Sequence, residues 1–260
     1  MADGRRDVWN PEQYEKFRGE RAAPFLDLLS MLEPPRAGGR VLDLGCGTGE
    51  LTRLAHERLG ARETIGVDNS PAMLAKAAAH AGGGLSFVSS DLASFGEGGF
   101  DVVLSNAAIH WVPDHEALVP RLLRLAAPGG QLAIQAPAND HHASHAISRE
   151  VAREPEFAGP LGGFVRVSPV LEPEAYARIL FRAGVARQRV RHEVYAHVLA
   201  SPGDVAEWLR GTTLTDYEKR LDAPTFARFF ERYRERLLAA LPDERPFVYT
   251  FRRVFVWARR

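Results

Sequence analysis

The residues best placed to do chemistry are three glycines at alternate positions, Gly45, Gly47 and Gly49. Apolar residues at Val41, Leu42 and Leu44 precede them and predict a strand, while the leucine spacing over residues 51–59 predicts a helix. Strand, glycine loop and helix begin a βαβ unit. Because glycine has no Cβ, such a loop turns tightly and lets a ligand approach the backbone closely. The segment is therefore a candidate binding site for a small molecule.

The glycine spacing and the charge that follows narrow the choice of ligand. The loop has the pattern G-x-G-x-G, and Glu50 stands where the dinucleotide-binding pattern G-x-G-x-x-G has its third glycine. A carboxylate at a helix N-terminus would repel a pyrophosphate, which normally binds at that helix end. This argues against a nicotinamide oxidoreductase, an alternative class that would share the fold. The loop favours a ligand without phosphates that has a ribose and a cationic part, a description that S-adenosylmethionine fits.

Polar residues end the three strands predicted next along the chain. A carboxylate about 20 residues past the glycine loop can accept hydrogen bonds from ribose hydroxyls. The carboxyl ends of parallel strands open into the same crevice, so we expect these side chains to line one site. The residues are Asp68 at the end of 63–68, Asp91 at the end of 85–92, and Ser105 with Asn106 at the end of 100–107.

Together these residues resemble the class I S-adenosylmethionine-dependent methyltransferases. Four segments are similar, more narrowly, to the trans-aconitate 2-methyltransferase family: VWNPEQY at 8–14, DNSPAML at 68–74, NAAIHWVPDH at 106–115 and RRVFVWARR at 252–260. The resemblance extends over nearly the whole chain and implies S-adenosylmethionine as cofactor and S-adenosylhomocysteine as product. It also implies that Asp91 and Leu92 flank the adenine. The cofactor-binding residues expected from the strand ends and the resemblance are Asp43, Gly45, Cys46, Gly47, Gly49, Asp68, Asn69, Asp91, Leu92 and Asn106.

The alternation of strands and helices over residues 33–137 requires a parallel sheet with right-handed crossovers. We expect an α/β fold with a doubly wound, mostly parallel seven-stranded sheet, whose sixth strand is at 185–194 and whose last is at 247–257. In the resembled superfamily these two strands normally form a hairpin, whereas here a helical insertion separates them. The predicted organisation is an N-terminal helical lid at 1–32, a cofactor-binding core at 33–195 with an irregular loop and helix insertion at 138–170, a helical cap at 196–245 and the last strand at 246–260. Helices are expected near 50–59, 71–80, 115–126, 172–183, 202–210 and 224–241, and a turn at 128–130.

Composition and charge exclude several classes of protein. The chain has 260 residues, of which 45% are hydrophobic and 25% charged, values typical of globular proteins. Its formal net charge of zero argues against nucleic-acid binding. It has no apolar run near the length of about 18 residues that a membrane helix needs, and no signal-peptide core, which predicts a cytoplasmic protein without membrane contact. One cysteine, Cys46, allows no internal disulfide. We expect a monomer or homodimer that acts on a small molecule.

The nature of the methyl acceptor decides whether the enzyme needs a general base. Transfer from a sulfonium is an in-line displacement, so the nucleophile, the methyl group and the sulfur must be aligned. A carboxylate acceptor is ionised at pH 7 and needs only donors that hold it and exclusion of water. An alcohol or phenol would need a base, for which His110 is the candidate; its alternative role is packing beside Trp111. By resemblance we expect the first chemistry, methyl esterification of a small di- or tricarboxylic acid such as trans-aconitate.

One face of the last predicted strand combines aromatic side chains with a cation. Strand side chains alternate, so Arg253 shares a face with aromatic residues that include Tyr249. A buried guanidinium needs an anionic partner, which is either an acceptor carboxylate or a structural Asp or Glu. The neighbouring Arg252 also allows a bulge, which would swap the two faces. The acceptor-binding residues expected are Arg253, Tyr249, Trp111 and, from an N-terminal helix that otherwise packs on the core, Tyr14 and Phe17.

Three histidines, His141, His142 and His145, receive no role from the sequence. The first and third would share one face of a helix, but no acidic or cysteine partner has the spacing of a metal ligand, so we expect no metal. One alternative of another class remains, a cofactor-binding protein without catalysis. The aromatic and arginine residues beyond position 137 argue against it, because such a protein would not keep an acceptor pocket.

Overall fold

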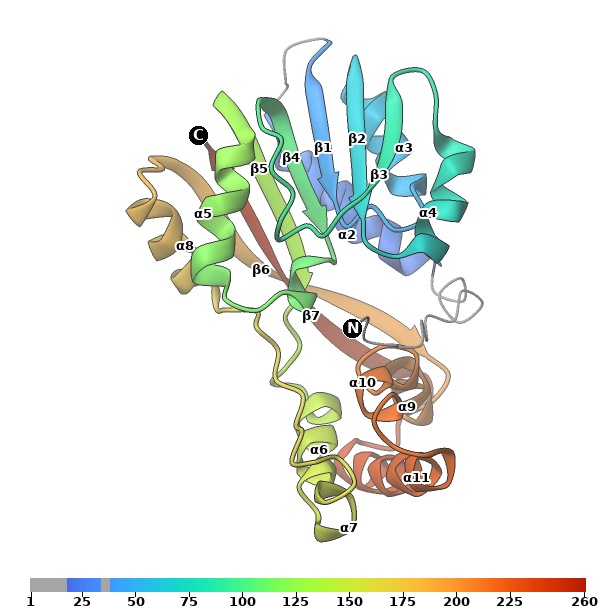
Figure 1. The fold of residues 1–260 in the computed structure, drawn as a ribbon. Coiled ribbons are helices and arrows are strands. Elements are labelled where there is room, and N and C mark those ends of the chain that lie inside the picture. The colour runs from blue at the N-terminus through green and yellow to red at the C-terminus, as the bar shows by residue number, and fades with distance from the viewer. Residues whose placement is uncertain (1–17, 34–37) are drawn as a thin grey trace. The chain divides into compact units, whose positions relative to one another are not determined.

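The computed structural model describes residues 18–33 and 38–260. Within these ranges a seven-stranded sheet has the order β3-β2-β1-β4-β5-β7-β6 (Figure 1). β1, β2, β3, β4 and β5 pair in parallel, and β7 is antiparallel to β5. The predicted α/β fold with a mostly parallel sheet is therefore confirmed. The strands are β1 Arg40–Leu44, β2 Glu63–Asp68, β3 Leu85–Ser89, β4 Phe100–Asn106, β5 Ala126–Pro137, β6 Arg187–Leu199 and β7 Phe247–Arg259.

Helices are present at all six expected positions, and three insertion helices separate β6 from β7, one more than the two that the sequence predicted. Two of the helical turns are of the 3₁₀ type, η1 Ala78–His80 and η2 Ile109–Trp111. The described helices are α2 Arg18–Ser30, α3 Glu50–Arg58, α4 Pro71–Ala77, α5 His115–Leu125, α6 Ala143–Ala152, α7 Pro155–Ala158, α8 Pro173–Arg182, α9 Gly203–Arg210, α10 Thr215–Glu218 and α11 Ala223–Ala240.

The larger differences from the predicted strand bounds are in β3, β5 and β6. β3 ends at Ser89, because Asp91 Oδ1 accepts a hydrogen bond from the backbone N–H of Ala93 (2.7 Å) and turns the chain. The turn expected at 128–130 lies inside β5, as an irregularity where the register with β4 shifts. β6 continues past residue 194 to Leu199, because burial still alternates there, with exposed Val198 beside buried residues.

Contacts divide the described chain into two units. The core unit comprises Gly19–Ala138, Pro169–Glu193 and Arg252–Arg260, and the cap unit comprises Asn139–Ser168 and Val194–Phe251. β6 and β7 contribute residues to both. The segments at 138–170 and 196–245, treated as separate insertions in the sequence, thus supply most of one unit with a common core.

In the core unit, helices cover both faces of the sheet. α5 and α8 cover one face, where Val119 and Tyr176 belong to the same buried cluster as Val254 and Val256 of β7. On the other face, Gln131 of β5 binds the segment that follows α2. Its Oε1 accepts hydrogen bonds from the backbone N–H of Glu33 and from Nε1 of Trp257, both at 2.8 Å. In Figure 1, α5 lies in front of the sheet and α2 behind it.

The cap unit has an aromatic core of its own. Trp208 of α9, Phe229 and Tyr233 of α11, and Tyr249 of β7 are all buried in one cluster, against which α6 also packs. Burial of several large aromatic rings supplies most of the stabilisation of such a small unit. The hydroxyl of Tyr249 hydrogen-bonds with Asn139 Nδ2 and Ser144 Oγ, each at 3.3 Å.

His145 is buried inside the cap unit. Its Nδ1 is 3.1 Å from Ser144 Oγ and its Nε2 is 3.3 Å from Thr213 Oγ1. Burial, and next the positive charge of Arg166, lower the pKa of His145 to about 3. The imidazole is therefore neutral at pH 7 and acts as part of a hydrogen-bonded network.

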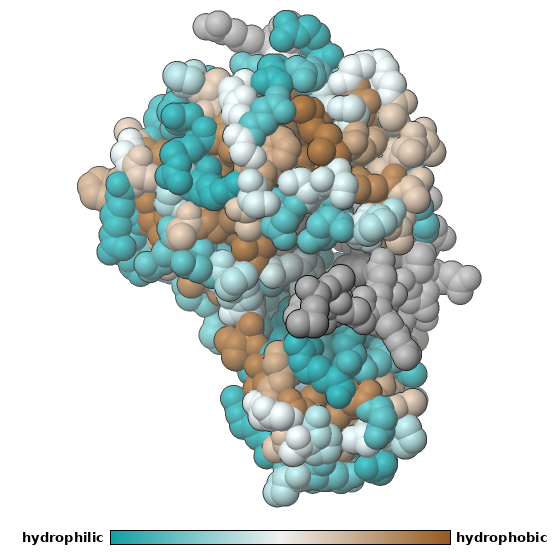
Figure 2. Space-filling view, in the orientation of Figure 1, coloured by the Kyte–Doolittle hydropathy of each residue, from teal (hydrophilic) through white to brown (hydrophobic). Residues whose placement is uncertain are grey.

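The described surface is mixed in character. On the face shown in Figure 2, hydrophilic residues are interspersed with hydrophobic ones on both units. Phe181 of α8, 76% exposed, is the most exposed large hydrophobic side chain described. Among the described helices, none is long and apolar enough to cross a membrane.

The lowered pKa of His145 predicts a pH-dependent stability. The unfolded chain binds a proton to this imidazole near pH 6.5, whereas the folded chain does not until about pH 3. Stability from His145 is therefore full above pH 6.5 and is lost as the pH falls, by about 1.4 kcal/mol per pH unit. Urea unfolding of wild type and His145→Gln between pH 7 and 4.5 should show the stability difference shrinking at that rate. His141→Gln, at an exposed histidine, is the control, and parallel profiles for His145→Gln and wild type would refute this account.

Candidate active site

Three of the predicted cofactor residues lie on one face of the sheet. Asp43 of β1 pairs with the β2 residue two positions before Asp68 and with the β4 residue two positions before Asn106. Since strand side chains alternate, the three side chains share a face. Thr52 of α3 donates a hydrogen bond to Asp43 Oδ2 (2.6 Å), which identifies this as the face that α3 covers.

The same face continues through β5 to β7. Asn106 pairs with Gln135 of β5, Gln135 pairs with Phe255, and Arg253 lies two residues before Phe255. We call Asp68, Asp43, Asn106, Gln135 and Arg253 the edge row, in the order of their strands β2, β1, β4, β5 and β7. Along this row the first two side chains are carboxylates, the next two are neutral amides, and the last is a guanidinium.

Asp68 holds the glycine loop in place. Its Oδ2 accepts a hydrogen bond from the backbone N–H of Gly47 and its Oδ1 from that of Ser70, both at 2.9 Å. A carboxylate has about four acceptor positions, so each oxygen can still accept a further bond from a ligand hydroxyl. Asp68 is thus fixed in one orientation before any ligand arrives.

Gly45 and Gly47 both need glycine, for different reasons. Their φ angles are +83° and +54°, values that L side chains rarely adopt. A Cβ on Gly45 would lie 2.2 Å from Cβ of Ala108, so the loop after β4 packs directly on this glycine. A Cβ on Gly47 would meet nothing within 4 Å. The space beside Gly47 is open, as a ligand pressed against the backbone requires.

Asp43 is fully buried and keeps one oxygen for another partner. Its Oδ1 has no hydrogen-bond partner among the residues that the structure describes. Burial, and to a smaller extent the charge of Asp68, raise the pKa of Asp43 to about 6, against the bond from Thr52. A buried carboxylate of this kind favours a cationic ligand, which would lower its pKa again.

The remaining predicted cofactor residues differ in conformation and burial. Glu50 is the first residue of α3, and Gly49 is its N-cap, in the left-handed conformation. Burial raises the pKa of the Cys46 thiol well above its ordinary value, which disfavours the thiolate that a nucleophile needs. Asn69 and Asp91 are exposed, and Leu92 packs half-buried against the hydrophobic cluster of the core unit.

A strained loop after β4 carries His110 and Trp111. Ala107 has φ +50°, unusual for a residue with a Cβ, and its N–H donates to the carbonyl of Gln135 (2.8 Å). The rings of His110 and Trp111 are 4.6 Å apart, and Trp111 is 45% exposed. Backbone strain of this kind clusters at ligand-binding sites.

His115, for which the sequence predicted no role, positions that loop. His115 Nε2 lies 2.9 Å from the carbonyl of Ile109 and its Nδ1 2.5 Å from the hydroxyl of Tyr176 on α8. Burial lowers the pKa of His115, so the ring is neutral, donating through Nε2 and accepting through Nδ1. Gln135 is a second residue that the sequence did not single out, although it is polar within the otherwise apolar run 132–136.

The predicted acceptor residues are not brought together in one unit. Arg253, 6% exposed, belongs to the core unit, where it lies on the predicted aromatic face of β7 with Phe255 and Trp257. Tyr249 is fully buried in the cap unit with its hydroxyl hydrogen-bonded. Tyr14 and Phe17 lie outside the described residues.

The three histidines of the cap unit have separate surroundings. His142 is the N-cap of α6 and accepts a hydrogen bond through Nδ1 from the backbone N–H of Ser144 (3.1 Å), while His141 is exposed and precedes the helix. The expected shared helix face of His141 and His145 is therefore wrong. In the described part of the chain, no three His, Cys, Asp or Glu side chains are grouped as metal ligands would be.

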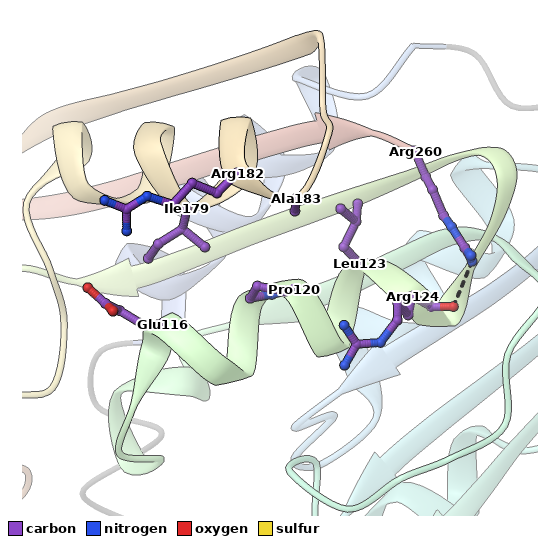
Figure 3. A pocket seen from close by; sticks show the side chains of 8 residues that line it. All are labelled: Glu116, Pro120, Leu123, Arg124, Ile179, Arg182, Ala183 and Arg260. Carbon is purple, nitrogen blue, oxygen red and sulfur yellow. Dashed lines mark hydrogen bonds between the residues drawn. The ribbon is translucent and has the colours of Figure 1, made fainter.

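A groove of about 470 Å³ lies away from the edge row, between α5 and α8 (Figure 3). Arg124, Arg182 and Arg260 line it, and Arg260 Nη1 donates to the carbonyl of Arg124 at 2.8 Å. The groove belongs to the opposite face of the sheet, because α5 and α8 cover the face of Val254 and Val256. It is separate from the candidate active site.

Comparisons with known proteins agree with this geometry. A family model described as a methyltransferase domain matches residues 14–186. The fold resembles Haemonchus contortus phosphoethanolamine N-methyltransferase 2 in complex with S-adenosyl-L-methionine (TM-score 0.60, 18% identity, 100% of this chain and 60% of that one). It also resembles an S-adenosylmethionine-dependent methyltransferase from Mesorhizobium loti (TM-score 0.52, 23% identity, 93% and 99%). Fold and domain match define a class I S-adenosylmethionine-dependent methyltransferase.

Sequence relatives narrow this class to a family. The chain is 43% identical to the trans-aconitate 2-methyltransferase of Deinococcus radiodurans, over 97% of this chain and 98% of the relative. It is 38% identical to that of Variovorax paradoxus, again over 97% and 98%. The chain belongs to the family of trans-aconitate 2-methyltransferases.

The two loop glycines give a paired prediction. Gly45→Ala should destabilise the fold by about 2–5 kcal/mol, because left-handed strain adds to a clash with Ala108. Gly47→Ala should cost only the strain, about 1–2 kcal/mol, but its methyl group should fill the ligand space and weaken S-adenosylhomocysteine binding at least tenfold. Urea unfolding and calorimetry measure the two effects. Wild-type affinity in Gly47→Ala would show that the cofactor does not use this space.

Proposed function

We propose that the chain transfers the methyl group of S-adenosylmethionine to a carboxylate of a small di- or tricarboxylic acid, with trans-aconitate as the first candidate. The observation that carries this proposal is the charge order of the edge row. Carboxylates at β2 and β1 suit a cofactor whose methionine part has an ammonium and a sulfonium group, while Arg253 at β7 suits an anionic acceptor. The names of the relatives support the same acceptor.

Several features of the core unit fit S-adenosylmethionine. The unpartnered Oδ1 of Asp43 would accept from the cofactor ammonium, and the open backbone at Gly47 would lie against the methionine part. Asp68 would accept from the ribose hydroxyls with its remaining lone pairs. Gly45 and Gly49 would shape the loop, and Cys46, Asn69 and Asn106 would line it, with Asp91 and Leu92 beside the adenine.

The chemistry asks little of the protein beyond alignment. When bound, S-adenosylmethionine would supply a methyl group on a sulfonium. The acceptor oxygen would form the new O–C bond as the C–S bond breaks, and the electron pair of the C–S bond would stay on sulfur. An ionised carboxylate needs no proton removed, so the chain's task is to hold it with Arg253 and exclude water. Trp111 remains a proposed acceptor contact in the core unit.

The raised pKa of Asp43 predicts pH-dependent cofactor binding. A cationic ammonium binds the ionised carboxylate, so affinity is full above the pKa of about 6 in the free protein. Below that pH a proton must be displaced, and affinity should fall by about tenfold per pH unit. Calorimetry with S-adenosylhomocysteine from pH 7.5 to 4.5 measures this. Asp43→Asn should bind more weakly and lose the dependence; a flat wild-type profile would place the ammonium elsewhere.

The acceptor proposal is tested by a methyl-transfer screen. We expect turnover with trans-aconitate or another small di- or tricarboxylate, and none with phenols. At saturating cofactor, kcat should show no base titrating near pH 6–7, and His110→Ala should reduce it by less than about tenfold, through packing alone. If phenols are methylated and His110→Ala abolishes activity with cofactor binding intact, the enzyme is instead an O-methyltransferase with His110 as base.

A further inference from the structure

Gln135 of β5 is completely buried yet makes no side-chain hydrogen bond. Its exposed fraction is 0%, and neither Nε2 nor Oε1 has a partner among the described residues. Leaving a buried amide unsatisfied costs free energy that an apolar residue of the same shape would avoid. Such a side chain is therefore expected to gain its hydrogen bonds when a ligand binds.

Gln131 on the same strand is a comparison case, a buried glutamine whose side chain makes hydrogen bonds within the protein. It lies four residues earlier, on the same face, and is equally buried. Its Oε1 accepts from Glu33 N–H and Trp257 Nε1, and its Nε2 donates to the carbonyl of Glu33, all at 2.8 Å. The described residues therefore supply hydrogen-bond partners for the Gln131 side chain and none for that of Gln135.

The pairing of β5 with β7 relates Gln135 to Arg253. Trp257 occupies the diagonal position opposite Gln131, and the 2.8 Å bond shows that side chains reach each other across this diagonal. Arg253 occupies the same diagonal position opposite Gln135, since Arg253 pairs with Pro137 as Trp257 pairs with Ala133. A directed amide donor and a guanidinium therefore lie side by side on one face.

We propose that the Gln135 amide binds a carboxylate of the methyl acceptor together with Arg253, an inference that rests on the proposed function. Nε2 donates to a carboxylate oxygen, and the guanidinium supplies the charge and a second donor. On the other side of Gln135, Asn106 Oδ1 is also without a partner among the described side chains, and the carboxylates follow beyond it. Gln135 therefore marks the boundary between the acceptor part and the cofactor part of the row.

The test compares Gln135→Met with Gln131→Met, two matched changes on one strand face. Each variant is measured for its melting temperature, its calorimetric Kd for S-adenosylhomocysteine, and its KM and kcat with trans-aconitate. Gln135→Glu is a third variant, which places a negative charge beside the acceptor carboxylate.

Gln135→Met should melt at or above the wild-type temperature, because no hydrogen bond within the protein is lost. Its KM for trans-aconitate should rise roughly ten- to a hundredfold, the loss of one bond to a charged group, with Kd for S-adenosylhomocysteine within about twofold of wild type. Gln135→Glu should raise KM further. Gln131→Met should lower the melting temperature and leave KM unchanged.

Two results would overturn the inference and separate it from the proposed function. If wild type methylates small carboxylic acids but Gln135→Met has an unchanged KM, Gln135 does not bind the acceptor and the proposed function stands. If wild type methylates no carboxylic acid in the screen, the proposed function and this inference both fail.

Discussion

The register between neighbouring strands decides which side chains share a face, and the site of this enzyme depends on it. A shift of one residue between β4 and β5 would turn Gln135 to the side of α5 and α8 and place an apolar residue beside Asn106. The antiparallel pairing of β7 likewise determines that Arg253, and not Arg252, joins the edge row. Apolar packing under α5 and α8 holds this register, because the alternate residues of the same strands fill that cluster.

In the proposed site, the charges along the row give each end a separate task. Asp43 is buried deeply enough for its pKa to rise to about 6 in spite of the hydrogen bond from Thr52, and a cationic ligand would lower that pKa again. At the other end a buried arginine offers an anion a planar, bidentate partner. Neutral amides separate the two, so in the proposed site the opposite charges of cofactor and acceptor would not compete for one group.

Local sequence patterns predicted those parts of the candidate site whose conformation depends on residues nearby in the sequence. The glycine loop, Glu50 at the start of α3 and the polar strand ends are of this kind. The sequence did not indicate the role proposed for Gln135, because that role depends on its pairing with Asn106 and Phe255. These residues are distant in sequence and become neighbours only through strand pairing. His115 was missed for the same reason, since its partner Tyr176 lies 61 residues away. The sequence also did not predict that Asn139–Ser168 and Val194–Phe251 share a core. The aromatic residues of that core are too far apart in sequence for a local pattern to connect them.

A crystal structure with S-adenosylhomocysteine and trans-aconitate tests the central claim, that the edge row separates cofactor from acceptor. The account predicts the methionine ammonium within hydrogen-bond distance of Asp43, and a carboxylate of the acceptor within hydrogen-bond distance of Gln135 Nε2 and Arg253. An acceptor carboxylate bound away from Gln135 and Arg253, or a cofactor whose ammonium faces Arg253, would contradict it.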